Sequence, residues 1–399
     1  MIYLDHAATT PVLPAALKAA WPYLTGEFGN PSSSHELGHR AAGALEVART
    51  RVACALGARA SEVIFTSGGT EGDNAALIGF ALGAPRGKHI ISARTEHEAV
   101  LETLEFLQRV HGFEVTWLPV ARTGGISLDD LDAALREDTT LVTLMLANNE
   151  IGTIHPVAEI ATRAHAVGAR LHTDAVQAVG WLPVNFAKLG VDALTISGHK
   201  IGAPKGSGAL LVRAGQPFEP LIHGGGQERE LRSGTENVAW AVALATALES
   251  VIEPVEITGL DRLDQRGHRL IAGILDAIPS AQLTGPVSTG STSDPNSTSD
   301  RSSTSDDRHP GICSFVFPGV NGETLLLELE QRGVIVSSGA ACAAGKDDPS
   351  HVLLACGFDE DTARTAVRFS LGHGTTSEEI ASTVQTLKDA HAAVSALGA

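Results

Sequence analysis

The sequence predicts an α/β fold, in which a large domain with a mostly parallel, seven-stranded sheet flanked by helices is joined to a smaller α+β domain. Short apolar runs alternate with amphipathic segments across residues 60–215, the pattern of strands connected by crossover helices. Apolar residues make up 43% of the chain and aromatic residues only 4%, so aliphatic side chains must build the core, as in parallel strands covered on both faces. A length of 399 residues favours two domains.

Seven runs have the length and composition of strands. They cover residues 62–66, 89–93, 114–119, 141–147, 170–173, 193–196 and 208–212. Amphipathic segments lie between most of them, at residues 70–82, 98–110, 128–135 and 157–167. Because a helix between two parallel strands crosses back over the sheet, this alternation predicts helices on the faces of the sheet.

The remainder of the chain predicts the second domain. Residues 237–278 have the pattern of one continuous helix that links the sheet to it, and residues 284–308 are a Ser/Thr/Asp/Gly-rich stretch that we expect to be a disordered surface insertion. Further elements follow: a strand at 312–317, a helix at 323–331, strands at 334–336 and 366–370, and a helix at 377–394. We expect a large cofactor-binding domain at 15–255 and a small α+β domain formed by 1–14 and 256–399.

Composition and cysteine usage exclude several classes of protein. The formal net charge of −17 opposes direct binding to nucleic acid or to an anionic membrane. The longest apolar runs fall well short of the roughly 20 residues that a membrane-spanning helix needs, and no signal region opens the chain. Cys54, Cys313, Cys342 and Cys356 form no Cys-x-x-Cys pair, which argues against a disulfide framework or a zinc knuckle. We expect a cytoplasmic protein with reduced thiols.

Two predicted strand ends carry a lysine and a carboxylate. Residues 192–200, Asp-Ala-Leu-Thr-Ile-Ser-Gly-His-Lys, lead from a strand through a glycine turn to Lys200, and Asp174 ends another strand with Gln177 just beyond it. Ligands of open α/β sheets bind outside the carboxyl ends of the strands. Either residue alone is more often simply solvated. Together they suit pyridoxal phosphate, in which a lysine forms an imine and an acid keeps the pyridinium nitrogen protonated.

A glycine-rich turn follows the strand at 62–66. Its sequence, Thr-Ser-Gly-Gly-Thr-Glu-Gly-Asp-Asn at residues 66–74, opens a helix, so free backbone N–H groups and the Thr70 hydroxyl are placed to hold a phosphate. A nucleotide P-loop is the competing interpretation, but its Gly-x-x-x-x-Gly-Lys-Ser/Thr pattern does not occur in the sequence.

His97 ends the turn after the strand at 89–93 and is expected at the same sheet edge. A zinc helix of the His-Glu-x-x-His type is excluded because residue 101 is leucine. His172 and Asp174 have no third ligand at useful spacing, so no metal is expected.

Cys342 lies in Ser-Ser-Gly-Ala-Ala-Cys-Ala-Ala-Gly-Lys, a run of small side chains at residues 337–346 that we expect to be mobile and to expose the thiol. A structural cysteine is normally buried among larger apolar groups, which describes Cys313 in its strand. The sequence therefore favours chemistry at Cys342.

Taken together, these motifs resemble the cysteine desulfurases of the NifS/IscS type, which belong to the class V aminotransferase group of the fold-type I pyridoxal-phosphate enzymes. The resemblance runs from Tyr-Leu-Asp-His-Ala-Ala-Thr-Thr-Pro at 3–11 to Val-Arg-Phe-Ser-Leu-Gly at 367–372. Five motifs lie between them in the family's order: Phe-Gly-Asn-Pro-Ser-Ser (28–33), Thr-Ser-Gly-Gly-Thr-Glu (66–71), Asn-Asn-Glu-Ile-Gly (148–152), Ser-Gly-His-Lys (197–200) and Arg-Ser-Gly-Thr (232–235).

The resemblance implies a role for each residue around the cofactor ring. Lys200 would hold pyridoxal 5'-phosphate as an imine and later remove the α-proton of the substrate. Asp174 would pair with the ring nitrogen and Gln177 would bond the phenolic oxygen. His97 would stack on the ring and move protons.

The resemblance also implies the phosphate site. Gly69, Thr70, Ser197 and His199 would bind the phosphate, joined by Thr235 from a second subunit. That last contact requires a homodimer.

For the substrate, L-cysteine, the resemblance implies binding by Asn149, which also contacts the cofactor, and by Arg368, whose guanidinium matches a carboxylate. Cys342 would take the sulfur as a persulfide, leaving L-alanine. A sulfur-acceptor protein, either an iron–sulfur scaffold or a tRNA-thiolating enzyme, would then receive the sulfur. The sequence departs from the family at Ala340, where a serine is usual, and we expect activity to survive this change.

Two other kinds of function remain open. An aminotransferase, a C–S lyase or a selenocysteine lyase on the same fold would use the same cofactor, and the first two would be indifferent to Cys342. A noncatalytic scaffold of a sulfur pathway would be expected to have lost Lys200 or Cys342, and the sequence keeps both.

Overall fold

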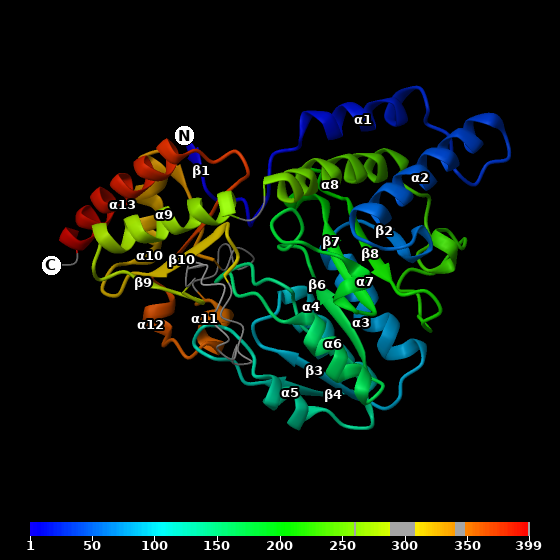
Figure 1. Cartoon of the computed structure of the whole chain (residues 1–399), viewed down its shortest axis with the longest axis horizontal. Helices are drawn as coiled ribbons and strands as arrows, with labels where there is room; N and C mark the ends of the chain where they lie inside the picture. Colours follow the sequence, from blue (N-terminus) through cyan, green and yellow to red (C-terminus); the bar gives the residue numbers. More distant parts are fainter. Residues whose placement is uncertain (259–260, 288–307, 340–347, 398–399) are drawn as a thin grey trace, which may run out of the picture.

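The computed structural model describes residues 1–258, 261–287, 308–339 and 348–397. It has a large lobe built on one sheet and a smaller lobe that contains both chain termini (Figure 1). Seven strands form the large sheet: β2 Val63–Thr66, β3 His89–Ala93, β4 Glu114–Leu118, β5 Thr139–Thr143, β6 Arg170–Asp174, β7 Ala193–Ser197 and β8 Gly208–Val212.

The order of these strands is β2-β8-β7-β6-β5-β3-β4. Only β8 runs antiparallel to its neighbours, whereas β7, β6, β5, β3 and β4 pair in parallel. This confirms the predicted mostly parallel seven-stranded sheet. The prediction placed the strand at 141–147 too far along the chain, because β5 begins and ends earlier, at Thr139 and Thr143.

Helices cover both faces of the large sheet. On one face lie α2 (Glu36–Ala55), α5 (Leu128–Ala134), α6 (Val157–Ala166), α7 (Phe186–Leu189) and α8 (Val238–Thr258), and on the other lie α3 (Gly69–Gly83) and α4 (Glu98–His111). Adjacent strand residues serve opposite faces: Ile90 packs with α3 and α4, and Ile91 packs with the other core. Strands buried on both faces explain why they appear in the sequence as short apolar runs.

The predicted single helix at 237–278 is two helices in the structure, α8 and α9 (Asp261–Ala277). The residues of α8, such as Leu244, belong to the core of the large lobe, and those of α9, such as Leu270, belong to the core of the small lobe. The chain therefore passes from one hydrophobic core to the other between these helices. Helical periodicity alone does not record which core each turn faces.

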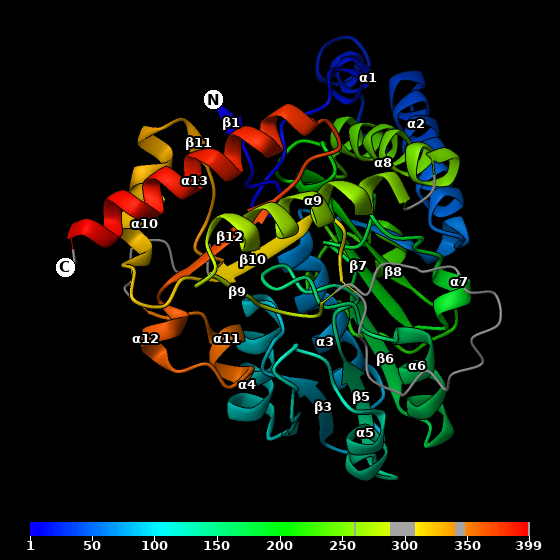
Figure 2. The same ribbon diagram turned by 60° about the vertical axis from the view of Figure 1, so that its left-hand side comes forward.

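The small lobe contains an antiparallel three-stranded sheet in the order β12-β10-β9. A two-stranded parallel sheet lies beside it (Figure 2). Helices α9 and α13 run along one side of the three-stranded sheet. The elements are β1 Ile2–Tyr3, β9 Gln282–Leu283, β10 Ile312–Val316, α10 Gly322–Gln331, β11 Val334–Ile335, α11 His351–Ala355, α12 Glu360–Ala363, β12 Ala366–Ser370 and α13 Ser377–Leu397. One helix of the large lobe, α1 (Pro14–Thr25), packs against α8.

The predicted insertion at 284–308 is too wide at both ends. Thr284 is buried and its backbone N–H donates to the Ser314 carbonyl at 2.9 Å. Arg308 is also buried, and its guanidinium donates to the carbonyl oxygens of Pro286 at 2.6 Å, of Ile312 at 3.0 Å and of Thr284. Because these bonds satisfy buried carbonyls, the ends belong to the packed lobe. Residues 288–307 lie outside the described part of the chain.

Candidate active site

The carboxyl ends of the parallel strands carry most of the side chains predicted for the site. Asp174 ends β6, Ser197 ends β7, and the 3₁₀ turn Gly198–Lys200 follows β7 directly. His97 follows β3 as the N-cap of α4, and Gly69 begins α3 after β2. Since these strands run in the same direction, the side chains gather at one edge of the sheet.

The N-terminal segment lies over Lys200. The Lys200 Nζ donates to the Ala8 carbonyl at 2.9 Å and to the Ala7 carbonyl. Gln177 Nε2 donates to the same Ala7 carbonyl at 3.0 Å. Two backbone carbonyls therefore orient the amine of Lys200. The motif at 3–11 carries the family resemblance, but no periodicity or spacing in it indicates this contact.

Asp174 supplies a carboxylate to the site and His97 supplies an imidazole. The Asp174 carboxylate is buried and its Oδ1 accepts the Val176 N–H at 2.8 Å. Burial raises the pKa of Asp174, whereas the nearby His97 imidazole and the positive charge of Lys200 act in the opposite direction. His97 Nδ1 accepts the Ala99 N–H at 3.0 Å, so Nε2 is the ring nitrogen that carries a hydrogen.

The turn before α3 forms a backbone cradle. Gly68, with φ of 155°, is the N-cap of α3 and has no side chain to satisfy the first N–H groups of the helix. A Cβ on Gly69 would lie 3.0 Å from Val176 Cγ2 and 3.5 Å from Ser197 Cβ, so a larger residue would crowd the cradle. These N–H groups, with the hydroxyls of Thr70 and Ser197, make a donor set suited to a phosphate.

His199 is held on the same side of the site by the N-terminal segment. Its Nδ1 lies 3.2 Å from Thr9 Oγ1, and Thr10 Oγ1 donates to the His199 carbonyl at 2.8 Å. Burial, together with the charge of Lys200, lowers the pKa of His199 to about 4. The ring is therefore neutral near pH 7 and offers one N–H donor.

Arg368, on β12, joins the two lobes at the site. It is fully buried, and its Nη1 donates to the Asn149 carbonyl at 2.9 Å and the Gly339 carbonyl at 3.2 Å. Nη2 forms an ion pair with Asp5 Oδ1 at 2.9 Å. Within the described residues Nε has no hydrogen-bond partner. Cys342 lies outside those residues, so its predicted role stays a prediction.

Thr235 lies apart from Lys200 within one chain. It is exposed and borders a cavity of about 250 Å³ whose lining includes Ser67 and Arg232 but not Lys200. Arg232 holds this loop in place through an ion pair with Glu71 in the first turn of α3, at 2.8 Å. Thr235 is thus near the phosphate cradle and open to a neighbouring molecule.

Three polar groups near the site were not predicted from the sequence: Asp5 on Arg368, and the buried carboxyls of Asp73 and Glu96. Asp73 lies inside a glycine-rich motif and Glu96 precedes His97, so neither has a spacing of its own that marks it. In the described ranges, no group of three or more His, Cys, Asp or Glu is placed to hold a metal ion. Nor does this part of the chain contain a helix long and apolar enough to span a membrane.

Comparison with known proteins agrees with this geometry. The model of the aminotransferase class-V family matches residues 2–382. A cysteine desulfurase IscS of Dictyoglomus turgidum is 44% identical over 388 residues, 97% of this chain and 93% of that protein. A solved NifS-like protein has a TM-score of 0.86 at 35% identity and covers 97% of this chain and 98% of its own. A structure of SspA in complex with cysteine has a TM-score of 0.77 at 34% identity, covering 93% and 99%.

The family match defines the class of enzyme. Class-V aminotransferases are pyridoxal-phosphate enzymes of fold type I, and the uncapped start of α3, the Asp174 carboxylate and the Lys200 amine fit that cofactor. Identity over nearly the whole chain then narrows the assignment, and the chain belongs to the cysteine desulfurases of the NifS/IscS type.

Proposed function

We propose that the chain releases sulfur from L-cysteine by holding pyridoxal phosphate between Lys200 and Asp174. One observation carries this proposal: the amine and the carboxylate lie at the ends of neighbouring strands. Burial raises the pKa of Asp174, and the His97 imidazole and the charge of Lys200 oppose that rise. When bound, the cofactor supplies an electron sink for the substrate's α-carbon. An ionised Asp174 keeps the ring nitrogen protonated, which that sink requires.

The geometry of the turns supports the remaining cofactor contacts of the proposal. The free N–H groups at the start of α3, with Thr70, Ser197 and His199, hold the phosphate, and Gln177 bonds the phenolic oxygen. His97 covers the ring and moves protons through Nε2, because its Nδ1 is occupied by a backbone N–H. Together these residues fix the cofactor before the substrate arrives.

Arg368 binds the substrate carboxylate. Its Nη1 is engaged by carbonyls and its Nη2 by Asp5, so Nε is the donor left over among its contacts with the described residues. Asn149, whose backbone carbonyl bonds Arg368, contacts the same end of the substrate. With the carboxylate held, the Lys200 amine takes the α-proton.

The sulfur leaves on Cys342. Its thiolate forms a sulfur–sulfur bond with the substrate as the carbon–sulfur bond breaks, and the carbon takes a proton to give L-alanine. The persulfide is then delivered to an acceptor protein, either an iron–sulfur scaffold or a tRNA-thiolating enzyme. We place this reaction in the cytoplasm, which suits the free thiols of Cys54, Cys313 and Cys356.

The active form in this proposal is a homodimer. Helix α1 lies on the outer side of α8 (Figure 1) and exposes Leu17, Trp21 and Leu24, and Phe28 just beyond it is 67% exposed. Such a contiguous run of large apolar side chains supports a protein interface. The exposed Thr235 then reaches the phosphate of the partner subunit.

The division into domains at 15–255 and at 1–14 with 256–399 is part of the same proposal. It is supported by the separate hydrophobic cores that α8 and α9 serve. Arg368 and Asp5 in the small domain then meet Asn149 in the large one across the substrate.

The proposal is tested with Cys342→Ala, using Cys54→Ala at an exposed cysteine as the matched control. We expect Cys342→Ala to lose alanine and persulfide formation from L-cysteine while its visible cofactor absorption remains, and Cys54→Ala to behave like the parent. Sulfur release at the parental rate in Cys342→Ala would overturn the persulfide role. A protein that takes up no pyridoxal phosphate would overturn the whole assignment.

A further inference from the structure

A row of buried polar side chains crosses the sheet beneath Asp174. Thr143 on β5, His172 on β6 and Thr195 on β7 are fully buried on the face that α3 covers. His172 lies next to Thr143 in the strand register, and Thr195 lies next to Asp174. His172 and Asp174, two residues apart on one strand, share this face. The row therefore lies directly under the carboxylate of the site.

The imidazole of His172 is satisfied by the two threonines. Its Nδ1 lies 2.9 Å from Thr143 Oγ1 and its Nε2 lies 3.0 Å from Thr195 Oγ1. Hydroxyl groups both donate and accept, so a neutral imidazole bonds both without a charge. Asp73 reaches this row from α3, with its Oδ1 3.5 Å from His172 Nε2.

A charged pair of Asp73 and His172 does not fit this geometry. Buried ion pairs need direct charge-assisted hydrogen bonds of about 2.7–2.9 Å to offset the loss of hydration. The Asp73 Oδ1 has no hydrogen-bond partner among the described residues, and the nitrogen facing it already bonds Thr195. Burial lowers the pKa of His172 to about 3, in agreement with a neutral ring.

Three carboxyls are buried close together, those of Asp73, Glu96 and Asp174, and the question is which of them is ionised. Asp73 and Glu96 each have an oxygen without a partner in this part of the chain, whereas Asp174 faces His97 and Lys200. An ionised carboxylate with an unpaired oxygen is costly in an apolar interior. Burial raises the pKa of both Asp73 and Glu96, and the negative charge of Asp174 raises them further.

We propose that Asp73 and His172 form an uncharged positioning pair beneath Asp174, which leaves Asp174 as the anion among the three buried carboxyls and so able to hold the ring nitrogen of the cofactor. The inference rests on the proposed role of Asp174. In this arrangement the Thr195 hydroxyl bonds both His172 and the Asp73 carboxyl. Because Thr195 pairs with Asp174 in the sheet, these bonds hold the two side chains in place relative to Asp174. Glu96 stays uncharged and anchors the Met145 N–H at 2.9 Å.

The same chemical change at two of the three carboxyls tests the charge assignment. Asp73→Asn replaces a protonated acid by a neutral amide of the same shape, so the apoprotein should bind pyridoxal phosphate within about twofold of the parent. Asp174→Asn removes the proposed anion and should weaken binding by about tenfold or more, which corresponds to roughly 1.4 kcal/mol. The probe is pyridoxal phosphate itself, titrated into apoprotein and followed by absorbance and by tryptophan fluorescence.

Thermal stability gives a second readout that needs no cofactor. The folded state keeps a proton on Asp73 that the unfolded chain releases above its ordinary pKa near 3.9, so the cost of the buried acid grows as pH rises. Asp73→Asn removes that cost. Its melting temperature should exceed that of the parent by about 2 °C or more at pH 8, with the gain shrinking towards pH 5.

The histidine is tested by a conservative pair. His172→Gln keeps a neutral group that bonds both threonines and should retain the cofactor affinity, whereas His172→Leu removes both bonds and should weaken it about fivefold or more. The proposal is overturned if Asp73→Asn weakens cofactor binding as much as Asp174→Asn does, or if it lowers the melting temperature at pH 8. It is also overturned if His172→Leu binds the cofactor as tightly as His172→Gln. Parental affinity in Asp174→Asn would instead overturn the proposed function.

Discussion

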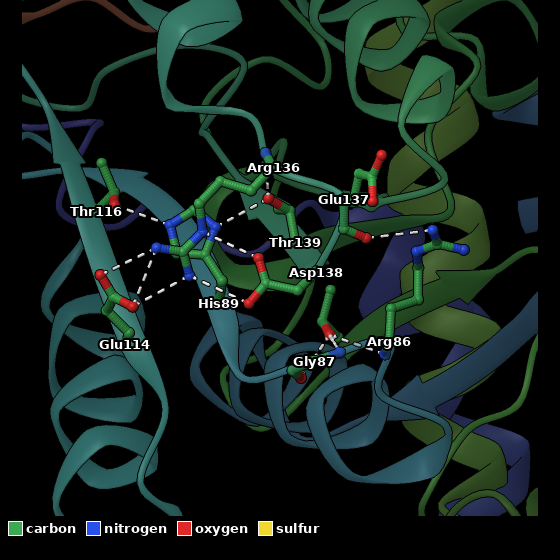
Figure 3. A network of polar contacts seen from close by, with 10 residues as sticks. Arg86, Gly87, His89, Glu114, Thr116, Arg136, Glu137, Asp138 and Thr139 are labelled. Carbon is green, nitrogen blue, oxygen red and sulfur yellow. Dashed lines mark hydrogen bonds and ion pairs between the residues drawn. The ribbon is translucent and has the colours of Figure 1, made fainter.

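Buried polar groups are hydrogen-bonded differently at the two ends of the strands in the large sheet. At the amino end, His89 on β3 has a threonine on each ring nitrogen: Thr139 at 2.8 Å from Nδ1 and Thr116 at 2.8 Å from Nε2 (Figure 3). At the carboxyl end, His172 has the same arrangement, but a carboxyl oxygen of Asp73 faces it without a hydrogen bond. The two imidazoles are thus bonded alike, and only His172 has an unbonded carboxyl oxygen beside it.

The neighbours of His89 continue the contrast. Arg136 binds the Glu114 carboxylate through two nitrogens at 3.0–3.1 Å and also contacts Asp138 (Figure 3). Nearby, Thr140 Oγ1 accepts the Arg86 and Gly87 N–H groups. Near the carboxyl end, by contrast, Asp73 and Glu96 each have a buried oxygen without a partner among the described residues, and the buried Nε of Arg368 on β12 has none there either. Fully paired groups stabilise one structure, whereas the unpaired Nε of Arg368 is where we expect the substrate to complete the bonding.

The largest effect should come from Lys200→Ala at the carboxyl end. Removing the amine removes both the covalent attachment of the cofactor and the base that takes the α-proton, so alanine formation from cysteine should fall by roughly a thousandfold or more. Lys205→Ala, at an exposed lysine in the same loop region, is the matched control and should keep the parental rate. Near-parental turnover in Lys200→Ala would contradict the site assignment.

Arg368→Lys should have the next largest effect. Lysine keeps the charge but lacks the fork that contacts Asn149 and Asp5 while leaving Nε for the substrate. Loss of a charge-assisted hydrogen bond is worth about 1.5–3 kcal/mol, so kcat/KM for cysteine should fall by roughly ten- to a hundredfold, mainly through KM. Arg332→Lys, in an exposed helix pair with Glu328, should leave both constants unchanged. A purely structural Arg368 would lower stability and leave KM in place.

His89→Leu tests the amino end. The substitution removes the imidazole from the buried Thr139 hydroxyl and the half-buried Thr116 hydroxyl, which should reduce the free energy of unfolding by about 1–3 kcal/mol. Activity per folded molecule should stay at the parental value, because no group of the site contacts this network. Denaturant unfolding and steady-state kinetics on the same preparation separate the two. A large fall in kcat with unchanged stability would contradict the conclusion that the His89 network is structural and separate from the active site.

The smallest effect is expected in the pH dependence of stability. The pKa of buried His172 is lowered to about 3 by burial, so between an ordinary value near 6.5 and about 3 the unfolded chain binds a proton that the folded protein does not. Stability is therefore lost as pH falls through this window. His172→Gln removes this loss and should shift the acid-unfolding midpoint to lower pH, as measured by circular dichroism. An unshifted or higher midpoint would show that His172 is charged in the folded protein.

The elements of the large sheet were predictable because local patterns determine them. The helix predicted at 128–135 appears as Leu128–Ala134, and the strand predicted at 208–212 appears as Gly208–Val212. Lys200 and Asp174 were predicted to share an edge because parallel strands present their carboxyl ends together. The helical runs in residues 14–55, which form α1 and α2, lay before the alternating region and were not predicted.

The limits of prediction are clear at three places. The single helix expected at 237–278 is divided between two cores, and the insertion expected at 284–308 has ordered ends because Arg308 bonds the carbonyls that its own segment would leave unpaired. Asp5 meets Arg368 across a separation of 363 residues. No local periodicity carries information on contacts of that kind.

By itself the sequence determined the family, the seven strands of the large sheet and the residue types at their ends, since turn chemistry and apolar spacing act over a few residues. Only the tertiary structure decided the strand order, the placement of the N-terminal carbonyls on Lys200 and the burial of Asp73 opposite His172. Burial and charge depend on what surrounds a side chain in space. The pKa shifts of the site residues therefore could not be predicted from the sequence and required the folded structure.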